Sequence, residues 1–145
     1  MQEYRYPLAT STWDEAEINA MQKVISSRNF TMGERVRAYE AEFAEFFGSK
    51  HAVMSNSGSS ANLLAMGSIK YSSFGADKTK DEVIVPAVSW STTYYPIAQM
   101  GFKLRFVDVD LETLNASAVD IESAITNKTA GIVAVNLLGN PSELS

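Results

Sequence analysis

The stretch DEVIVPAVSWSTTYYPIAQMGFKLRFVDVD, residues 81–110, decides the fold. It contains two strand-like runs, Glu82–Pro86 and Lys103–Val109, on either side of a helix-like segment, Ser91–Met100. The first run is apolar at successive positions, which is typical of a strand buried on both faces. Two strands joined by a crossover helix run parallel. The stretch therefore predicts a mostly parallel sheet with helices on both faces.

The alternation of strands and helices continues on both sides of this stretch. Upstream, the pattern predicts a strand over His51–Ser55, a loop over Asn56–Ser60 and a helix over Ala61–Ile69. Downstream, it predicts a helix over Ala118–Ile125 and a strand over Gly131–Asn136. No closing helix follows that strand within the 145 residues. We therefore expect an α/β fold that is truncated.

The first 50 residues have the pattern of two amphipathic helices. Thr12 and Glu15 have the spacing of a capping box at the start of the first helix, whose apolar face repeats at Ile18, Met21 and Ile25. The second helix follows Gly33 and ends at Gly48. We interpret its aromatic residues as core residues: Tyr39, Phe43, Phe46 and Phe47. Residues 1–50 thus form an N-terminal helical segment, and residues 51–145 form an incomplete α/β domain.

Composition excludes several classes of function. The net charge of −5 argues against non-specific binding to nucleic acid or to an anionic membrane. The chain has no cysteine and one histidine, which excludes disulfides and thiolate sites, and no metal centre is expected. Because no apolar run reaches membrane-spanning length and the N-terminus has no signal core, we expect a cytoplasmic protein without a membrane segment.

Three segments follow predicted strands and therefore lie where open α/β sheets bind ligands: Asn56–Asn62, Pro86–Thr93 and Leu137–Pro141. In the first of them, Gly58 allows a tight turn and a close approach to a ligand. Ser59 and Ser60 follow at the start of a helix, where backbone N–H groups and hydroxyls favour an anion. This pattern predicts a phosphate site without a basic residue. An ordinary capped turn between strand and helix is an equally good local interpretation.

Trp90 ends the second of these segments, where a small turn residue would be expected. A flat indole at the carboxyl edge of a sheet can stack on an aromatic cofactor ring. On local grounds alone, a tryptophan packed under a loop is the better interpretation. Both alternatives stay open at this point.

Six motifs in order resemble those of the DegT/DnrJ/StrS family of sugar-nucleotide aminotransferases and dehydratases, which depend on pyridoxal 5′-phosphate (PLP) and have fold type I. They are Tyr6–Ala9 with Ser11–Asp14, Phe30–Gly33, Ser57–Leu64, Val85–Pro96, Phe106–Asp108 and Asn136–Pro141. The resemblance covers nearly the whole chain. It implies the N-terminal part of the large, PLP-binding domain.

The resemblance also implies roles for individual residues. Gly58, Ser59 and Ser60 resemble the segment that holds the PLP phosphate, and Trp90 resembles the aromatic residue stacked on the pyridine ring. Arg28, Asn29, Phe30 and Thr31 resemble the stretch that contacts the sugar nucleotide. Asn136–Pro141 resembles the loop under the cofactor. No lysine here lies in a matching context, so the Schiff-base lysine, or a histidine replacing it, is expected beyond Ser145, and the isolated chain is expected to be inactive.

The form of the loop Leu138–Pro141 resembles the 3-dehydratase branch of the family, which acts in deoxysugar synthesis such as that of the O-antigen sugar colitose. That resemblance implies a GDP-linked 4-keto-6-deoxy sugar as substrate, glutamate as amino donor and a homodimer at full length. One alternative is a related 4-aminotransferase. Another, from a different class, is a non-catalytic nucleotide-binding α/β module, which the absence of a dinucleotide fingerprint disfavours.

Overall fold

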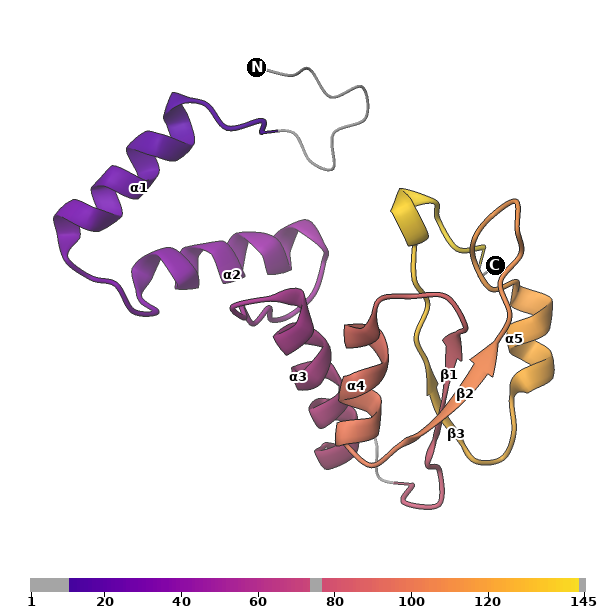
Figure 1. The fold of residues 1–145 in the computed structure, drawn as a ribbon. Coiled ribbons are helices and arrows are strands. Elements are labelled where there is room, and N and C mark those ends of the chain that lie inside the picture. Colours follow the sequence, from indigo (N-terminus) through magenta and orange to yellow (C-terminus); the bar gives the residue numbers. More distant parts are fainter. Residues whose placement is uncertain (1–10, 74–76, 144–145) are drawn as a thin grey trace. The chain divides into compact units, whose positions relative to one another are not determined.

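The computed structural model describes residues 11–73 and 77–143, and the chain divides into two compact units, Met1–Met54 and Ser55–Ser145 (Figure 1). The first unit contains the helices α1 (Glu15–Ser27) and α2 (Glu34–Phe46). The second contains all three described strands and the remaining helices. The motif Tyr6–Ala9 lies outside the described residues.

A three-stranded parallel sheet forms the centre of the second unit. Its strands are β1 (Glu82–Pro86), β2 (Lys103–Val107) and β3 (Thr129–Ile132), in the order β2-β1-β3. Both pairings are parallel, with Glu82 opposite Lys103 on one side and opposite Thr129 on the other. The parallel sheet expected from the sequence is therefore confirmed.

Helices cover both faces of this sheet (Figure 1). On one face, Val83 and Val85 of β1 pack in a cluster with Met66 of α3 (Gly58–Tyr71), Ile97 of α4 (Ser91–Gln99) and Phe102, which directly precedes β2. On the other face, Ile84 packs with Val107 and with Ala124 of α5 (Ala118–Ala124). Alternate side chains of β1 thus serve opposite layers, which explains why its apolar run is continuous.

The strands end earlier than the sequence predicts. The predicted strand Gly131–Asn136 is observed as Thr129–Ile132, and Lys103–Val109 ends at Val107. The pairing of β1 with β2 places Pro86 opposite Val107, and an extension of the pairing of β1 with β3 would place Pro86 opposite Ala134. On the β3 side the ladder ends at Pro86 because proline has no N–H to donate, whereas on the β2 side the Ala87 N–H still donates to the Val107 carbonyl at 2.7 Å. After β3, the chain continues into a 3-10 turn, η2 (Leu137–Gly139).

The predicted strand His51–Ser55 is wrong for the described residues, which have no strand there. A strand requires a partner to accept and donate its ladder hydrogen bonds, and the described residues provide none. Instead, the Met54 N–H donates to the Glu40 carboxylate at 2.8 Å.

Two helix starts also differ from those that the sequence predicts. Helix α1 begins with an Asp14–Glu17 capping box in place of Thr12–Glu15, and α3 begins at Gly58, ahead of Ala61.

The prediction that the aromatic residues in and directly after α2 belong to the core is wrong. The rings of Tyr39, Phe43 and Phe47 form a row of tilted contacts, with centroids 5.6 and 4.6 Å apart, and Phe46 packs edge-on against Phe47. Their exposed fractions nevertheless range from 42% for Phe43 to 83% for Phe46. A helix buries its apolar stripe only against another layer, and α1 and α2 are the only helices described in this unit.

None of the described helices is long and apolar enough to cross a membrane.

The first testable consequence concerns the larger core. Ile97 is 0% exposed in the layer between α4 and the sheet, so Ile97→Val should lower the free energy of unfolding by about 1 kcal/mol. Urea unfolding of the chain measures this change. Ile125→Val is the matched control, because Ile125 is 51% exposed and its variant should unfold like the wild type. Equal losses in both variants would contradict the described core.

Candidate functional site

The N-terminus of α3 is built by serine side chains. Ser57 is its N-cap: the Oγ accepts from the Ser60 N–H at 3.2 Å, and the carbonyl accepts from the Ala61 N–H at 3.0 Å. The Ser55 hydroxyl donates to the same Ser57 carbonyl at 2.9 Å. The sequence reasoning missed Ser57, although serine is among the preferred N-cap residues. The Ser60 N–H is therefore committed to the cap.

Gly58 and Ser59 are the remaining residues of the first turn. Among the described residues, nothing accepts a hydrogen bond from either of their N–H groups. Gly58 does not have a left-handed backbone, so the expected tight-turn role is not what requires glycine there. A Cβ built at Gly58 would meet nothing within 4 Å. The helix thus presents two N–H donors beside open space, where its dipole favours a negative charge.

The first turns of α3 and α4 are joined directly. The side-chain amide of Asn62 donates to the Thr92 carbonyl at 3.2 Å, which ties α3 to the start of α4. Between them lies a hollow of about 220 Å³, whose polar lining includes Ser59, Ser60 and Thr92. Ser59 and Ser60, two of the three residues expected to hold a phosphate, therefore lie on an accessible surface that two helices share.

Trp90 stands at the N-cap position of α4 with its side chain 75% exposed. It is thus not packed under a loop within the described residues, and its ring is available to a ligand. Its backbone is fixed from both sides. Its carbonyl accepts from the Thr93 N–H at 2.9 Å, and the hydroxyls of Ser89 and Thr93 are 2.8 Å apart.

Tyr94 anchors the same turn to the sheet. Its hydroxyl donates to the Pro86 carbonyl at the end of β1, at 2.9 Å, and its ring packs edge-on against Phe106 of β2. Burial raises the pKa of this phenol above its ordinary value, in agreement with its role as a protonated hydrogen-bond donor. The exposed Trp90 is therefore carried by a turn that the half-buried Tyr94 anchors to the sheet.

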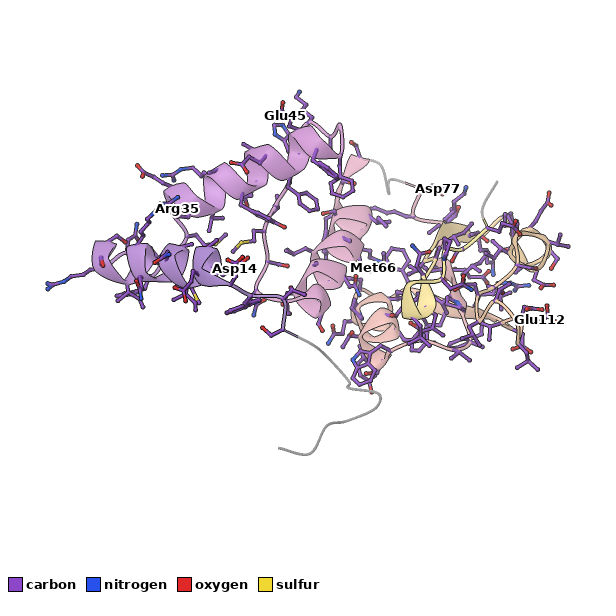
Figure 2. All side chains as sticks on the ribbon, turned by 90° about the horizontal axis from the view of Figure 1, so that it is seen from above. Asp14, Arg35, Glu45, Met66, Asp77 and Glu112 are labelled. Carbon is purple, nitrogen blue, oxygen red and sulfur yellow. The ribbon has the colours of Figure 1, made fainter. Side chains whose placement is uncertain are left out.

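The four residues expected to contact a sugar nucleotide lie in the first unit. Arg28 ends α1 in a left-handed conformation, with its N–H donating to the Ile25 carbonyl at 3.1 Å. Asn29, Phe30 and Thr31 line a hollow of about 650 Å³ between α1 and the start of α2, where Figure 2 labels Arg35. Arg28 does not line it. The structure thus brings three of the four together.

Carboxylates elsewhere in the chain have structural partners. Asp110 accepts from the N–H groups of Glu112 and Thr113 at 2.8 and 2.9 Å, and these bonds lower its pKa. Asp81 pairs with Lys103 at 2.5 Å, which likewise lowers the pKa of the carboxyl. Among the described residues, no cluster of His, Cys, Asp or Glu could hold a metal ion. The chemistry of the site therefore comes from backbone donors, hydroxyls and an aromatic ring.

These groups fit PLP at the level of the residues present. A phosphate requires N–H and hydroxyl donors with room for its oxygens, which Gly58 and Ser59 provide. A pyridine ring requires a flat apolar surface, which the exposed Trp90 offers.

Comparison with known proteins adds independent information. The model of the DegT/DnrJ/EryC1/StrS aminotransferase family matches residues 11–145. A GDP-4-keto-6-deoxy-D-mannose 3-dehydratase from Yersinia pseudotuberculosis is 57% identical over 95% of this chain, which corresponds to 35% of that protein. The chain thus spans about a third of the length of the curated relatives it matches.

Solved structures agree with this match. The 3-dehydratase from Escherichia coli with bound hydrated PLP is 53% identical and has a TM-score of 0.87, covering 95% of this chain and 36% of its own. An aminotransferase of pseudoaminic acid biosynthesis from Helicobacter pylori is 28% identical, with a TM-score of 0.78 over 90% of this chain and 34% of its own. The predicted fold class, part of the fold type I large domain, is confirmed.

Proposed function

Because this chain belongs to the DegT/DnrJ/EryC1/StrS aminotransferase family, we propose that it forms part of a PLP-dependent enzyme of deoxysugar synthesis. The proposed reaction removes the C3 hydroxyl of a GDP-linked 4-keto-6-deoxy hexose, with glutamate as amino donor. The observation that carries the proposal is the N-terminus of α3. There, open space beside Gly58 and the N–H donors of Gly58 and Ser59 suit a phosphate.

The chain's own residues have binding and orienting roles in this proposal. Gly58 and Ser59 hold the cofactor phosphate through their N–H groups, and the Ser59 hydroxyl adds a further donor. Trp90 would stack against the cofactor ring and help to orient it. Arg28, Asn29, Phe30 and Thr31 contact the sugar nucleotide. When bound, PLP supplies the electron storage that the elimination requires.

A 4-aminotransferase is the second candidate, because the family includes aminotransferases such as the one from Helicobacter pylori. The identity of 57% and 53% with two 3-dehydratases favours the dehydratase. A non-catalytic nucleotide-binding module is disfavoured by the family match.

We further propose that the full-length protein is a homodimer and is located in the cytoplasm. Light scattering of the purified full-length protein would test the dimer.

The test of the proposed function is glutamate consumption by the full-length protein. With PLP and GDP-4-keto-6-deoxymannose present, 2-oxoglutarate should form, and omission of either the sugar nucleotide or PLP should stop its continued formation. A non-catalytic module would form none under any condition. Absence of 2-oxoglutarate with all components present would overturn the proposal.

Trp90 gives a second test of the cofactor site. Trp90→Ala in the full-length protein should weaken PLP binding roughly three- to tenfold, because it removes one stacked ring face. It should also shift the absorption of bound PLP. Trp90→Phe should keep most of the affinity, since it retains an aromatic face. If Trp90→Ala unfolds the protein while PLP spectra of the folded fraction stay normal, the tryptophan has only a packing role.

A further inference from the structure

Asn115 is the one buried polar residue among the residues that the structure describes, with 4% of its surface exposed. It lies in the connection between β2 and α5, directly after a tight turn. The Asp110 carboxylate caps that turn, and Leu114 has a left-handed backbone with φ of 60°. A buried amide is costly unless its donors and acceptor are bonded, so its partners reveal what it does.

All partners of the Asn115 amide lie in the loop that follows β3. Its Nδ2 donates to the carbonyls of Asn140 and Pro141 at 3.0 and 3.3 Å. Its Oδ1 accepts from the Leu137 N–H at 3.3 Å. One side chain therefore holds both ends of the loop Leu137–Pro141 through backbone atoms. The Asn140 side chain returns a bond to the Thr113 carbonyl.

The held loop has an unfavourable backbone. Leu138 has φ of 55° and Gly139 has φ of 83°, and Leu138 is 89% exposed. A leucine in the left-handed region persists only where its surroundings impose it, and an exposed side chain imposes nothing. The bonds to Asn115 contribute to fixing this shape, together with the bond from Asn140 to Thr113, the bond from the Ser142 N–H to the Asn136 Oδ1 at 2.9 Å and the backbone bonds of the 3-10 turn.

The loop stands at the carboxyl end of β3, beside the connection that carries Asn115 (Figure 1). β3 pairs with β1, whose carboxyl end leads to Trp90. Ligands of open α/β sheets bind at this edge. A shift of the loop would therefore alter the surface next to the proposed cofactor site.

We propose that Asn115 is a positioning residue of the active site, which holds Leu137–Pro141 in the shape that PLP and the sugar require. The inference rests on the proposed function for its catalytic consequence. The tether, by which we mean the hydrogen bonds from the Asn115 side chain to Leu137, Asn140 and Pro141, does not require PLP. It can therefore be tested separately, by hydrogen exchange.

The first experiment measures deuterium exchange in the full-length protein without PLP. Asn115→Ala should speed exchange of the amides at Leu137, Gly139 and Asn140 at least tenfold. Asn115→Asp retains the acceptor for Leu137, so it should protect that amide better than Asn115→Ala does. Asn127→Ala is the matched control, because Asn127 is exposed and should leave the loop unchanged. If the loop amides of Asn115→Ala exchange as slowly as those of the wild type, the proposed role of Asn115 in holding the loop is contradicted.

The second experiment measures turnover at saturating PLP. Asn115→Ala should lower kcat/KM for the sugar nucleotide at least tenfold and shift the absorption of bound PLP. Asn115→Asp should show both changes too, because its second oxygen faces the carbonyls of Asn140 and Pro141 and has no N–H to donate to them. Ile121→Val, which trims the buried core of α5, should lower stability without either change. If Asn115→Ala does not fold, the shape-matched Asn115→Asp decides by the same two readouts.

The outcomes separate the two ideas. Wild-type kcat/KM and spectrum in the folded Asn115 variants would overturn the positioning role and leave the proposed function standing. A wild-type protein that neither binds PLP nor turns over would overturn the proposed function, and the catalytic part of this inference with it. Loss of kcat/KM together with fast loop exchange, and normal values in both controls, would support the inference.

Discussion

The product that the full-length protein makes from GDP-4-keto-6-deoxymannose and glutamate is expected to have one oxygen fewer than the substrate and no added nitrogen. In the proposed reaction, the C3–O bond breaks and its oxygen leaves as water. Glutamate is oxidised to 2-oxoglutarate and supplies the two electrons, and its nitrogen leaves as ammonia. The atoms and electrons balance without another reductant.

Mass spectrometry distinguishes this product from that of the alternative. An aminotransferase would place the nitrogen on C4 and keep the oxygen on C3. The 145-residue chain alone serves as the control and should form neither product. A 4-amino sugar with its C3 oxygen intact would contradict the dehydratase proposal and leave the family membership unchanged.

Gly58→Val is expected to weaken PLP binding of the full-length protein tenfold or more, about 1.4 kcal/mol. The surroundings of Gly58 give the physical reason for this loss of affinity. Gly58 has no left-handed backbone and its Cβ position is open, so valine should fit the folded chain. Its branched side chain would instead fill the space through which a phosphate reaches the N–H groups of Gly58 and Ser59.

Titration of PLP, followed by absorbance, measures the affinity, and urea unfolding checks that the variant keeps its stability. Ser59→Ala is the matched control. It removes only a hydroxyl from the same turn and leaves the backbone donors, so its loss should be clearly smaller. Equal affinity of the wild type and Gly58→Val would mean that this turn is structural only.

Local patterns in the sequence were sufficient for the sheet and for the start of α4. The continuous apolar run of β1 and the alternating helices predicted the parallel order, and the end of β1 predicted where Trp90 lies. Gly58 was expected to follow a strand at His51–Ser55, which the described residues do not form. The start of α1 was misplaced because Thr12–Glu15 and Asp14–Glu17 both have capping-box spacing. Only the observed hydrogen bonds select between them.

The remaining errors concern interactions between residues distant in the sequence. Strand pairing at His51–Ser55 and burial of Phe46 both depend on which other element lies alongside, and periodicity does not carry that information. The tether from Asn115 to Leu137–Pro141 crosses more than twenty residues, so no local motif marks it. In the sequence, Asn115 is simply a turn residue.

The central place of β1 sets an order for folding. Its partner β2 follows after one helix, whereas β3 follows only after β2, α5 and their connections. Closing the shorter loop loses less chain entropy, so the β1–α4–β2 unit should form first and β3 should dock onto it later. Substitutions between α4 and β1 should consequently slow folding, whereas those confined to β3 should mainly speed unfolding.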